Sequence, residues 1–269
     1  MDLTLRKGDH GAAVQELQRK LNAHGAKLLV DGWYGEATET AVATVQRRAG
    51  LVVDGIAGPK TQEVLRGERR IVRLREADLV AAAERLGAPL ASIKAVNEVE
   101  SRGSGFLDDG RPVILLERHV AYRQASAKGL DAAALLRRYP NLVNTARGGY
   151  VGGPAEWARF DNLRSVTTQA IAIESCSWGL FQVMGYHWDT LGYASAEDFQ
   201  RAMMASEANQ LGAFVRFIEA APALLKALKA RRWGEFARLY NGPAYKENLY
   251  DAKLAAAYAK YSKGERVAA

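Results

Sequence analysis

Eight residues near the start of the chain are repeated a little further on. Asp31-Gly32-Trp33-Tyr34-Gly35-Glu36-Ala37-Thr38 recurs 23 positions later as Asp54-Gly55-Ile56-Ala57-Gly58-Pro59-Lys60-Thr61. In both copies Asp-Gly predicts a turn with a positive φ, and the second glycine lets the backbone fold tightly before a helix. Apolar residues at the helical period precede the first copy and follow both, at Val14, Leu17, Leu21, Ala41, Val42, Val45, Val64 and Leu65. We therefore expect a small helical domain over residues 1–66, whose slight core favours an interaction role over catalysis.

The rest of the chain is long enough for a second, larger domain. Of the 269 residues, 48% are hydrophobic and 25% are charged, as in globular proteins. Residues 67–77 are rich in charge and lack a clean hydrophobic period, so we expect the linker there. A helix beginning at Asp78 is expected to open the second domain, over residues 78–269.

The composition disfavours several classes of function. No apolar run approaches the ~18 residues of a membrane span, and the first residues lack the apolar core of a signal peptide, so we expect cytoplasmic synthesis and no stable membrane insertion. One cysteine, Cys176, and four scattered histidines predict neither an internal disulfide nor a zinc centre, and we expect no metal and no cofactor. The net charge of +7 is not gathered in one patch, so nucleic acid is not an expected partner, although an anionic polymer such as a bacterial wall would attract the chain.

The second domain carries a glutamate on the apolar side of an expected helix. At 100° per residue this apolar stripe consists of Leu90, Ile93, Val96 and Val99. Glu100 falls within the stripe, whereas Glu98 points the other way and is spaced for a surface ion pair with Lys94. A carboxyl on a buried stripe is costly when ionised, so Glu100 is paired, lies at a cleft, or keeps its proton to higher pH, as a general acid must. The alternative is a helix-end carboxylate bonded to an arginine.

The segment after Glu100 predicts a helix end and a small hairpin. Residues 101–105 stop the helix, and Asp108–Pro112 predicts a tight turn between Phe106-Leu107 and residues 113–116. Glu117 then opens the next expected helix, where the helix dipole favours an acidic residue in any case. It is also the nearest carboxylate in sequence that could lie across the hairpin from Glu100.

Two later segments contain polar residues suited to sugars. Residues 174–185 include Ser177 and Gln182, which offer a hydroxyl and an amide, and Gly179, which would let a saccharide approach the backbone closely. Residues 236–243 include Tyr240 and Asn241. The alternative explanation for this segment is a helix C-terminus that ends at Asn-Gly-Pro. Between the hairpin and these segments, the glycine-rich residues 139–153 lack a Walker lysine and are expected to line a cleft.

These segments together resemble two known families. Residues 5–66 are similar to the three-helix peptidoglycan-binding module of wall hydrolases. The motifs EVESRGSGF, DGRP and LLERH resemble the muramidase domain of modular bacteriophage endolysins. The motifs SWGLFQVM and FARLYNGP are similar to motifs of goose-type lysozymes and lytic transglycosylases. The resemblance implies a mainly α, lysozyme-like α+β fold, in which a small three-helix binding domain precedes a larger helical domain with a small β-hairpin.

The resemblance also implies roles for individual residues. Glu100 is expected to be the general acid, and Glu117 a second active-site member whose role stays open. Ser177, Gln182, Tyr240 and Asn241 are expected to bind substrate. In the module the expected wall contacts are Asp31, Trp33, Tyr34 and Asp54, although aromatic residues in a small domain belong more often to its core.

The implied function is that of an endolysin. Such a protein binds peptidoglycan and hydrolyses the β-1,4 bond between N-acetylmuramic acid and N-acetylglucosamine. We expect a monomer that stays in the host cytoplasm until a separate holin-type pore releases it to the wall in the periplasm. One alternative is a lytic transglycosylase, which forms a 1,6-anhydromuramic product, and another is a non-catalytic wall-binding phage protein. Whether the anomeric configuration is retained or inverted depends on a second carboxylate and stays open.

Overall fold

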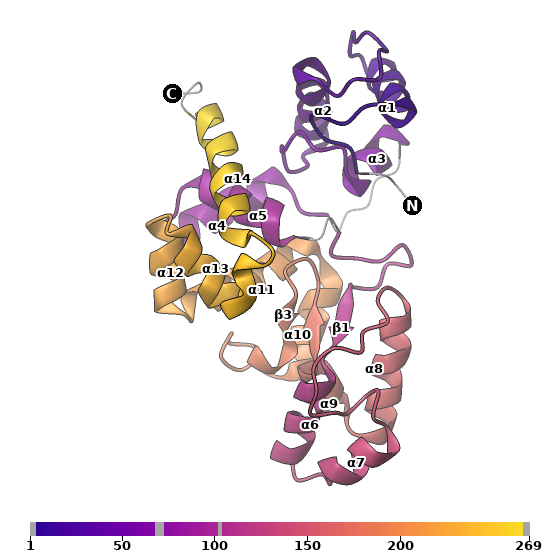
Figure 1. Ribbon diagram of the computed structural model, residues 1–269, viewed down its shortest axis with the longest axis vertical. Coiled ribbons are helices and arrows are strands. Elements are labelled where there is room, and N and C mark those ends of the chain that lie inside the picture. Colours follow the sequence, from indigo (N-terminus) through magenta and orange to yellow (C-terminus); the bar gives the residue numbers. More distant parts are fainter. Residues whose placement is uncertain (1–3, 68–72, 102–103, 266–269) are drawn as a thin grey trace. The chain divides into compact units, whose positions relative to one another are not determined.

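The computed structural model describes residues 4–67, 73–101 and 104–265 (Figure 1). The chain packs as two units, the first drawn from residues 1–103 and 226–269 and the second from residues 104–225. Two predicted segments, the linker at 67–77 and the helix-ending residues 101–105, fall partly on residues 68–72 and 102–103, which lie outside the described residues. None of the helices within the described ranges has both the length and the hydropathy that a membrane crossing requires.

The first unit begins with the predicted three helices. They are α1 (Ala12–Ala23), α2 (Glu36–Ala49) and α3 (Pro59–Leu65). The repeated turns precede α2 and α3, and Gly32 and Gly55 take the predicted positive φ, 77° and 69°. The amino-terminal segment bridges to both copies, through Leu5 with Ala57 and His10 with Trp33. Each copy of the repeat therefore forms a turn of the same kind and lies against the same short extended segment.

The first unit also contains helices from both ends of the larger predicted domain. They are α4 (Glu76–Leu86), α5 (Leu90–Glu100), α13 (Trp233–Asn241), the short η2 (Pro243–Lys246) and α14 (Tyr250–Glu265). Helix α4 begins two residues before the predicted start, because the Asp78 carboxylate accepts the Arg75 N–H at 2.8 Å and so caps the helix from its third position. Helix α5 packs against α4 and α14, with Ile93 and Val96 buried as the stripe predicted.

The second unit is helical around a small sheet. Its elements are β1 (Ile114–Leu116), α6 (Arg118–Ala127), α7 (Ala132–Arg138), α8 (Ala155–Val166), α9 (Gln169–Glu174), β2 (Cys176–Trp178), β3 (Val183–Met184), η1 (Gly185–His187), α10 (Ala196–Ala205) and α11 (Glu207–Glu219), and α12 (Pro222–Lys229) leads back to the first unit. The strands are antiparallel in the order β1-β2-β3. Four aromatic rings meet edge to face beside this sheet, from Trp157, Phe160, Trp178 and Phe199. The mainly α fold with a small β element is confirmed.

The predicted hairpin is only partly correct. A turn does form at the expected place, since the Leu107 N–H donates to Arg111 O at 2.7 Å and Phe106 bridges to Pro112. The strand that follows, β1, pairs with β2 instead, with Leu116 opposite Cys176. All three residues of β2 are buried, so pairing β1 with β2 satisfies the backbone of an interior strand, which the two-residue arm Phe106-Leu107 is too short to do.

Candidate functional site

Glu100 is the last residue of α5 and lies beside the end of α13. Its side chain is half-buried, and Asn241 Nδ2 donates a hydrogen bond to Glu100 Oε1 at 3.0 Å. Helix α13 ends at Asn241 because Gly242 takes a φ of 82°, which a residue with a side chain rarely adopts. The structure therefore brings together two predicted site residues that lie 141 positions apart in sequence.

Tyr240 belongs to the same group. Its ring stacks on Phe236 with a centroid separation of 6.0 Å and an interplanar angle of 17°. Burial raises the pKa of the Tyr240 hydroxyl well above its usual value, and the nearby charge of Glu100 raises it further. The hydroxyl therefore keeps its proton at neutral pH, so neither Tyr240 nor Asn241 brings a charge to Glu100.

Glu98 is not paired with Lys94 as the sequence predicted. Glu98 Oε2 accepts hydrogen bonds from Lys260 Nζ at 3.2 Å and from Tyr261 Oη at 2.5 Å, and Lys94 forms its ion pair with Glu76. The reason is that α4 and α14 flank α5, so both side chains reach a neighbouring helix instead of each other.

Glu117 precedes the first residue of α6, as predicted, but it does not cap the helix with its side chain. Tyr150 Oη lies 2.8 Å and 2.9 Å from the two carboxylate oxygens of Glu117 and donates to them. His119 Nδ1 lies 3.3 Å from Glu117 Oε2. The helix dipole alone does not account for this arrangement, because a tyrosine from the glycine-rich segment is aimed at the carboxylate.

The protonation of these neighbours follows from their surroundings. Partial burial and the hydrogen bond to Glu117 raise the pKa of Tyr150 to about 12, so the phenol keeps its proton. Burial lowers the pKa of His119 below its usual value, although the Glu117 charge opposes the shift. At pH 7 Glu117 therefore faces a neutral phenol and a neutral imidazole.

Ser177 and Gln182 are brought together at the turn between β2 and β3. Ser177 Oγ donates to Gln182 Oε1 at 2.8 Å, and Gln182 Nε2 donates to Gly179 O at 2.8 Å. Gln182 takes a φ of 52°, a left-handed conformation that is uncommon for a residue with a side chain. The polar atoms of both residues are thus engaged in holding this turn, and their substrate contact stays a prediction.

Gly179 is required for a different reason from the predicted one. Its φ is 70°, and a Cβ added there would lie 2.4 Å from Cδ of the buried Gln210 side chain. Gln210 Oε1 accepts the Leu180 N–H at 2.7 Å, so the amide supports the turn from inside. The missing side chain makes room for a buried amide, and it does not by itself indicate an approaching sugar.

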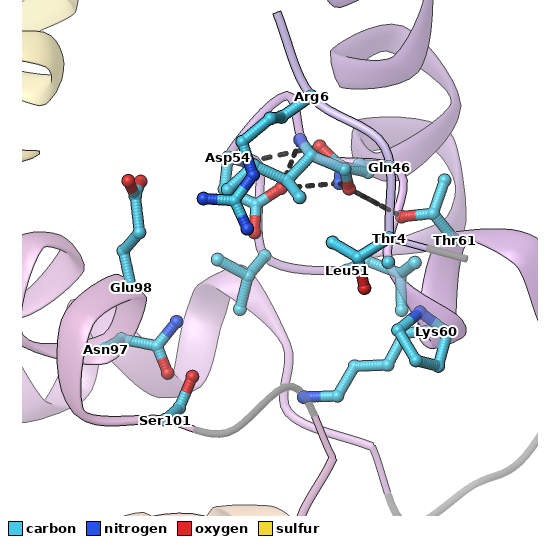
Figure 2. A pocket seen from close by; sticks show the side chains of 14 residues that line it. Thr4, Arg6, Gln46, Leu51, Asp54, Lys60, Thr61, Asn97, Glu98 and Ser101 are labelled. Atoms are coloured by element: carbon cyan, nitrogen blue, oxygen red, sulfur yellow. Dashed lines mark hydrogen bonds between the residues drawn. The ribbon is translucent and has the colours of Figure 1, made fainter. Parts of the chain in front are cut away.

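The two repeated turns of the module are held by the same set of side chains. Gln18 Nε2 donates to Asp31 Oδ1 at 2.8 Å and to Thr38 Oγ1 at 3.2 Å. In the second turn, Gln46 Nε2 donates to Asp54 Oδ1 at 2.7 Å and to Thr61 Oγ1 at 3.1 Å (Figure 2). Both aspartates thus have a structural role, which is independent of any contact with the wall.

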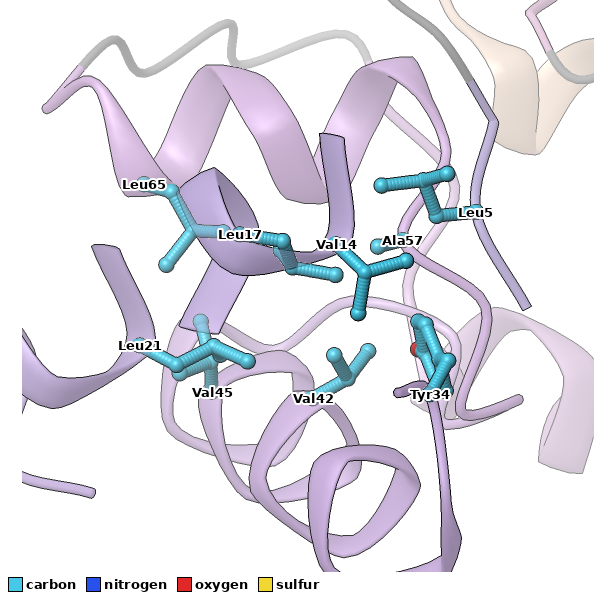
Figure 3. Close-up of a cluster of buried hydrophobic side chains, with 9 residues drawn as sticks. All are labelled: Leu5, Val14, Leu17, Leu21, Tyr34, Val42, Val45, Ala57 and Leu65. Atoms are coloured by element: carbon cyan, nitrogen blue, oxygen red, sulfur yellow. The ribbon is translucent and has the colours of Figure 1, made fainter. Parts of the chain in front are cut away.

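Tyr34 is a core residue, in contrast to its predicted role as a wall contact. It is fully buried in the cluster that Figure 3 shows, next to Val14 and Val42. Its hydroxyl donates to Gly55 O at 2.9 Å, which ties the first turn to the second. A side chain without exposed surface cannot touch a polymer, so Tyr34 is removed from the set of wall contacts.

Trp33 has the opposite exposure. Its side chain is 54% exposed and stacks on His10 with ring centroids 6.1 Å apart and an interplanar angle of 25°. The exposed ring face next to His10 offers the stacking surface that a sugar requires. Of the four predicted module residues, Trp33 alone presents a large apolar surface to solvent.

Comparisons with known proteins cover both parts of the chain. The family model of N-acetylmuramidases matches residues 89–262, and that of a putative peptidoglycan binding domain matches residues 10–65. The chain belongs to the N-acetylmuramidase family. This muramidase is similar to the crystal structure of the endolysin of Burkholderia phage AP3, with 54% sequence identity and a TM-score of 0.92 over 97% of this chain and 100% of that one. The predicted resemblance is confirmed.

Two curated relatives match the muramidase over a short stretch. The zinc D-Ala-D-Ala carboxypeptidase of Streptomyces albus G is 46% identical over 61 residues, which are 22% of this chain and 24% of the relative. A probable N-acetylmuramoyl-L-alanine amidase of Bacillus licheniformis is 42% identical over 66 residues, which are 23% of this chain and 19% of the relative. The match thus spans about a quarter or less of the length of these relatives.

Sequence reasoning missed three residues that organise the site and the module. Tyr150 lies in a segment with no periodic pattern, so nothing in the sequence linked it to Glu117. Gln18 and Gln46 were detectable, because Leu17-Gln18-Arg19-Lys20 and Val45-Gln46-Arg47-Arg48 repeat the same pattern in two helices. A longer search for the internal repeat would have found both glutamines.

Proposed function

We propose that this protein binds peptidoglycan through residues 1–66 and hydrolyses the β-1,4 bond between N-acetylmuramic acid and N-acetylglucosamine through residues 78–269, with residues 67–77 between the two domains. The observation that carries the proposal is the position of Glu100. It lies within the segment that matches the N-acetylmuramidase family, is half-buried at a helix end, and is held by Asn241. Cleavage of a glycosidic bond needs a proton donor to the leaving oxygen, and we assign this role to Glu100.

The neighbours of Glu100 suit a general acid. The Asn241 amide donates to one carboxyl oxygen, and the Tyr240 hydroxyl keeps its proton, so neither of these two residues brings a charge to Glu100. Both residues also lie at the end of α13, where an uncharged hydroxyl and amide can bind the hydroxyl and N-acetyl groups of a sugar. We thus infer that Asn241 positions Glu100 as well as binding substrate.

We assign Glu117 to the active site as its second carboxylate. Tyr150 donates to both of its oxygens, and the neighbouring His119 is neutral at pH 7, so these two residues orient the carboxylate without adding a positive charge. A carboxylate held in this way can stabilise positive charge on a sugar ring or activate a water molecule. Ser177 and Gln182 fix the turn between β2 and β3, and we infer that they bind substrate there.

The oligomeric state, the place of action and the partner complete the proposal. We infer that the protein works as a monomer on the wall in the periplasm and that a separate pore-forming protein lets it reach the wall from the cytoplasm. Peptidoglycan is the partner that the match of residues 10–65 supports.

Digestion of purified peptidoglycan, followed by mass spectrometry, tests the proposal. We expect products with a reducing N-acetylmuramic acid end, and we expect Glu100→Gln to lower the rate of their release by about 10²–10⁴-fold, since an amide cannot donate the proton. Glu84→Gln, an exposed change in α4, is the matched control and should not alter the rate. Products with a 1,6-anhydro end would identify a transglycosylase, and an unchanged rate for Glu100→Gln would remove its role as the acid.

A further inference from the structure

A cavity lies within the first unit, and its lining does not include Glu100, Tyr240 or Asn241. Its volume is about 310 Å³, in the lower part of the range of small-molecule sites. One wall is the second repeated turn of the module, with Asp54, and the other is the last part of α5, with Asn97, together with Ser101 directly after the helix (Figure 2). The cavity is therefore built by the module and the muramidase segment together.

Asn97 is the residue that points to a ligand. Its side chain is only 8% exposed, and Oδ1 has no hydrogen-bond partner within the part of the chain that the structure describes. Leaving a buried carbonyl oxygen without a donor costs about 1–3 kcal/mol. A ligand that brings an N–H group into the cavity would recover this cost.

The same cavity contains two carboxylates. Burial raises the pKa of Asp54 above its usual value, although Gln46 and the Ile56 N–H donate to it. Glu98 lines the opposite wall, where Lys260 and Tyr261 donate to it. An acceptor-rich wall of this kind suits an ammonium group better than a neutral amide.

Two cations also line the cavity. They are Arg6, from the amino-terminal segment, and Lys60, from the start of α3 (Figure 2). A guanidinium group binds a carboxylate through two parallel hydrogen bonds, which fixes the orientation of that carboxylate. Acceptors and cations in a space of this size suit a ligand that carries an ammonium and a carboxylate close together.

We propose that this cavity binds the zwitterionic end group of an amino acid in the stem peptide of peptidoglycan. The ammonium group lies against Asn97 and the carboxylate lies against Arg6. This inference rests on the proposed function, because stem peptides reach the cavity only if the protein works on the wall. It adds a peptide-reading site that is separate from the cleavage of the glycan.

The side chains of the cavity favour peptide over sugar. None of the described residues that line it is aromatic, so it lacks the stacking surface that most sugar sites use. The first repeated turn has the reverse character, with exposed Trp33 stacked on His10. The two turns of the module thus differ in the part of the wall that each can recognise.

Calorimetric titration of the full chain with a soluble muramoyl tripeptide tests this inference. The tripeptide ends in meso-diaminopimelate, whose side chain carries an ammonium and a carboxylate on one carbon. We expect saturable binding, about tenfold weaker after Asn97→Ala or Arg6→Ala. Lys7→Ala is the matched control, because it removes a neighbouring cation that pairs with Glu39 at 3.2 Å, and it should bind like the parent chain. The analogous tripeptide with lysine, which lacks the side-chain carboxylate, should bind more weakly.

Three outcomes of the titration would overturn the peptide site. Absence of saturable binding, equal affinity for both tripeptides, or parent-like affinity in both variants overturns the inference. If Asn97→Ala fails to fold, the exposed Arg6→Ala decides the question. Release of reducing ends from whole wall, measured on the same samples, separates the two proposals: hydrolysis without tripeptide binding refutes the peptide site alone, and tripeptide binding without hydrolysis refutes the proposed enzymatic function alone.

Discussion

The two repeated turns of the module have the same internal structure and opposite surroundings. In each, a buried glutamine binds an aspartate and a threonine seven positions later, Gln18 in the first turn and Gln46 in the second. The residue two positions after the aspartate is Trp33 in the first turn, which is 54% exposed, and the half-buried Ile56 in the second. Asp31 is exposed, whereas Lys260 Nζ donates to the backbone oxygen of Asp54 at 2.6 Å.

The difference shows how a duplicated element can acquire two roles. The hydrogen-bonded frame needs one glutamine, one aspartate and one threonine, so the same three residue types reproduce it in both turns. Recognition instead depends on what lies outside the frame, which is solvent at the first turn and helices α5 and α14 at the second. A second turn that is covered in this way can take a small charged ligand, while the uncovered first turn can lie on an extended polymer.

Removing the two glutamines should give the largest effect. Gln46→Ala leaves Asp54, Thr61 and two N–H groups without their partner, and we expect a local loss of about 3 kcal/mol, from 1–3 kcal/mol per unsatisfied buried group. The exchange rate of the Gly55 amide should then rise about a hundredfold. Gln18→Ala should raise the exchange of the Gly32 amide by a smaller factor, because Gln18 accepts from a single N–H.

Hydrogen exchange of the full chain, followed residue by residue, measures both effects. Thr40→Ala, an exposed change in α2, is the control and should leave both amides protected. If either glutamine change raises the exchange rates of the Gly32 and Gly55 amides equally, the module unfolds as one unit. The two turns would then not be independent hydrogen-bonded frames.

The sequence was sufficient for the features that arise within a few residues. It predicted the positive φ at Gly32 and Gly55, the three helices of the module, and the end of α5 at Glu100. These depend on turn chemistry and on the spacing of apolar residues, both of which are local.

The features that the sequence did not give depend on distant partners. Lys94 and Glu98 have ideal spacing for each other, yet each pairs with another helix. Strand β1 likewise pairs with a distant strand, since Leu116 faces Cys176, 60 positions further on. Trp33 and Tyr34 are adjacent aromatic residues, and neighbours in an extended segment point to opposite sides, but the sequence does not say which side is the core. The three-dimensional packing decides it, with Tyr34 fully buried and Trp33 54% exposed.

Removing the exposed ring of the first turn tests the surface side of the comparison. Trp33→Ala should weaken co-sedimentation of the full chain with purified peptidoglycan by about tenfold, as expected for the loss of an aromatic contact. Stability should change little, because more than half of the side chain is exposed. Leu29→Ala removes another exposed apolar side chain of the module and is the matched control. Equal loss in both variants would assign the binding to general hydrophobicity rather than to the turn.

The smallest expected effect is a pH dependence of opposite sign at the two aspartates. Hydrogen bonds from Gln18 and from the Trp33 N–H lower the pKa of Asp31 below its ordinary value of 3.8, so its stabilising contribution is present above that value and is lost as the pH falls through the lowered pKa. Burial raises the pKa of Asp54, so its contribution is present below 3.8 and is lost as the pH rises through the raised pKa.

Asparagine variants separate the two cases, because an amide keeps the acceptor oxygen and removes the charge. At pH 7, Asp31→Asn should reduce the protection of the Gly32 amide relative to the parent chain, whereas Asp54→Asn should preserve or increase the protection of the Gly55 amide. The difference at Asp54 should disappear below pH 3.8, where its carboxyl is protonated, whereas the difference at Asp31 should disappear only as the pH falls through its lowered pKa. Amide exchange at several pH values, corrected for the intrinsic rate, gives the comparison. A loss of protection at pH 7 in both variants would mean that Asp54 is stabilised as an anion by its cationic neighbours more strongly than burial destabilises it, and the two turns would then share one electrostatic character.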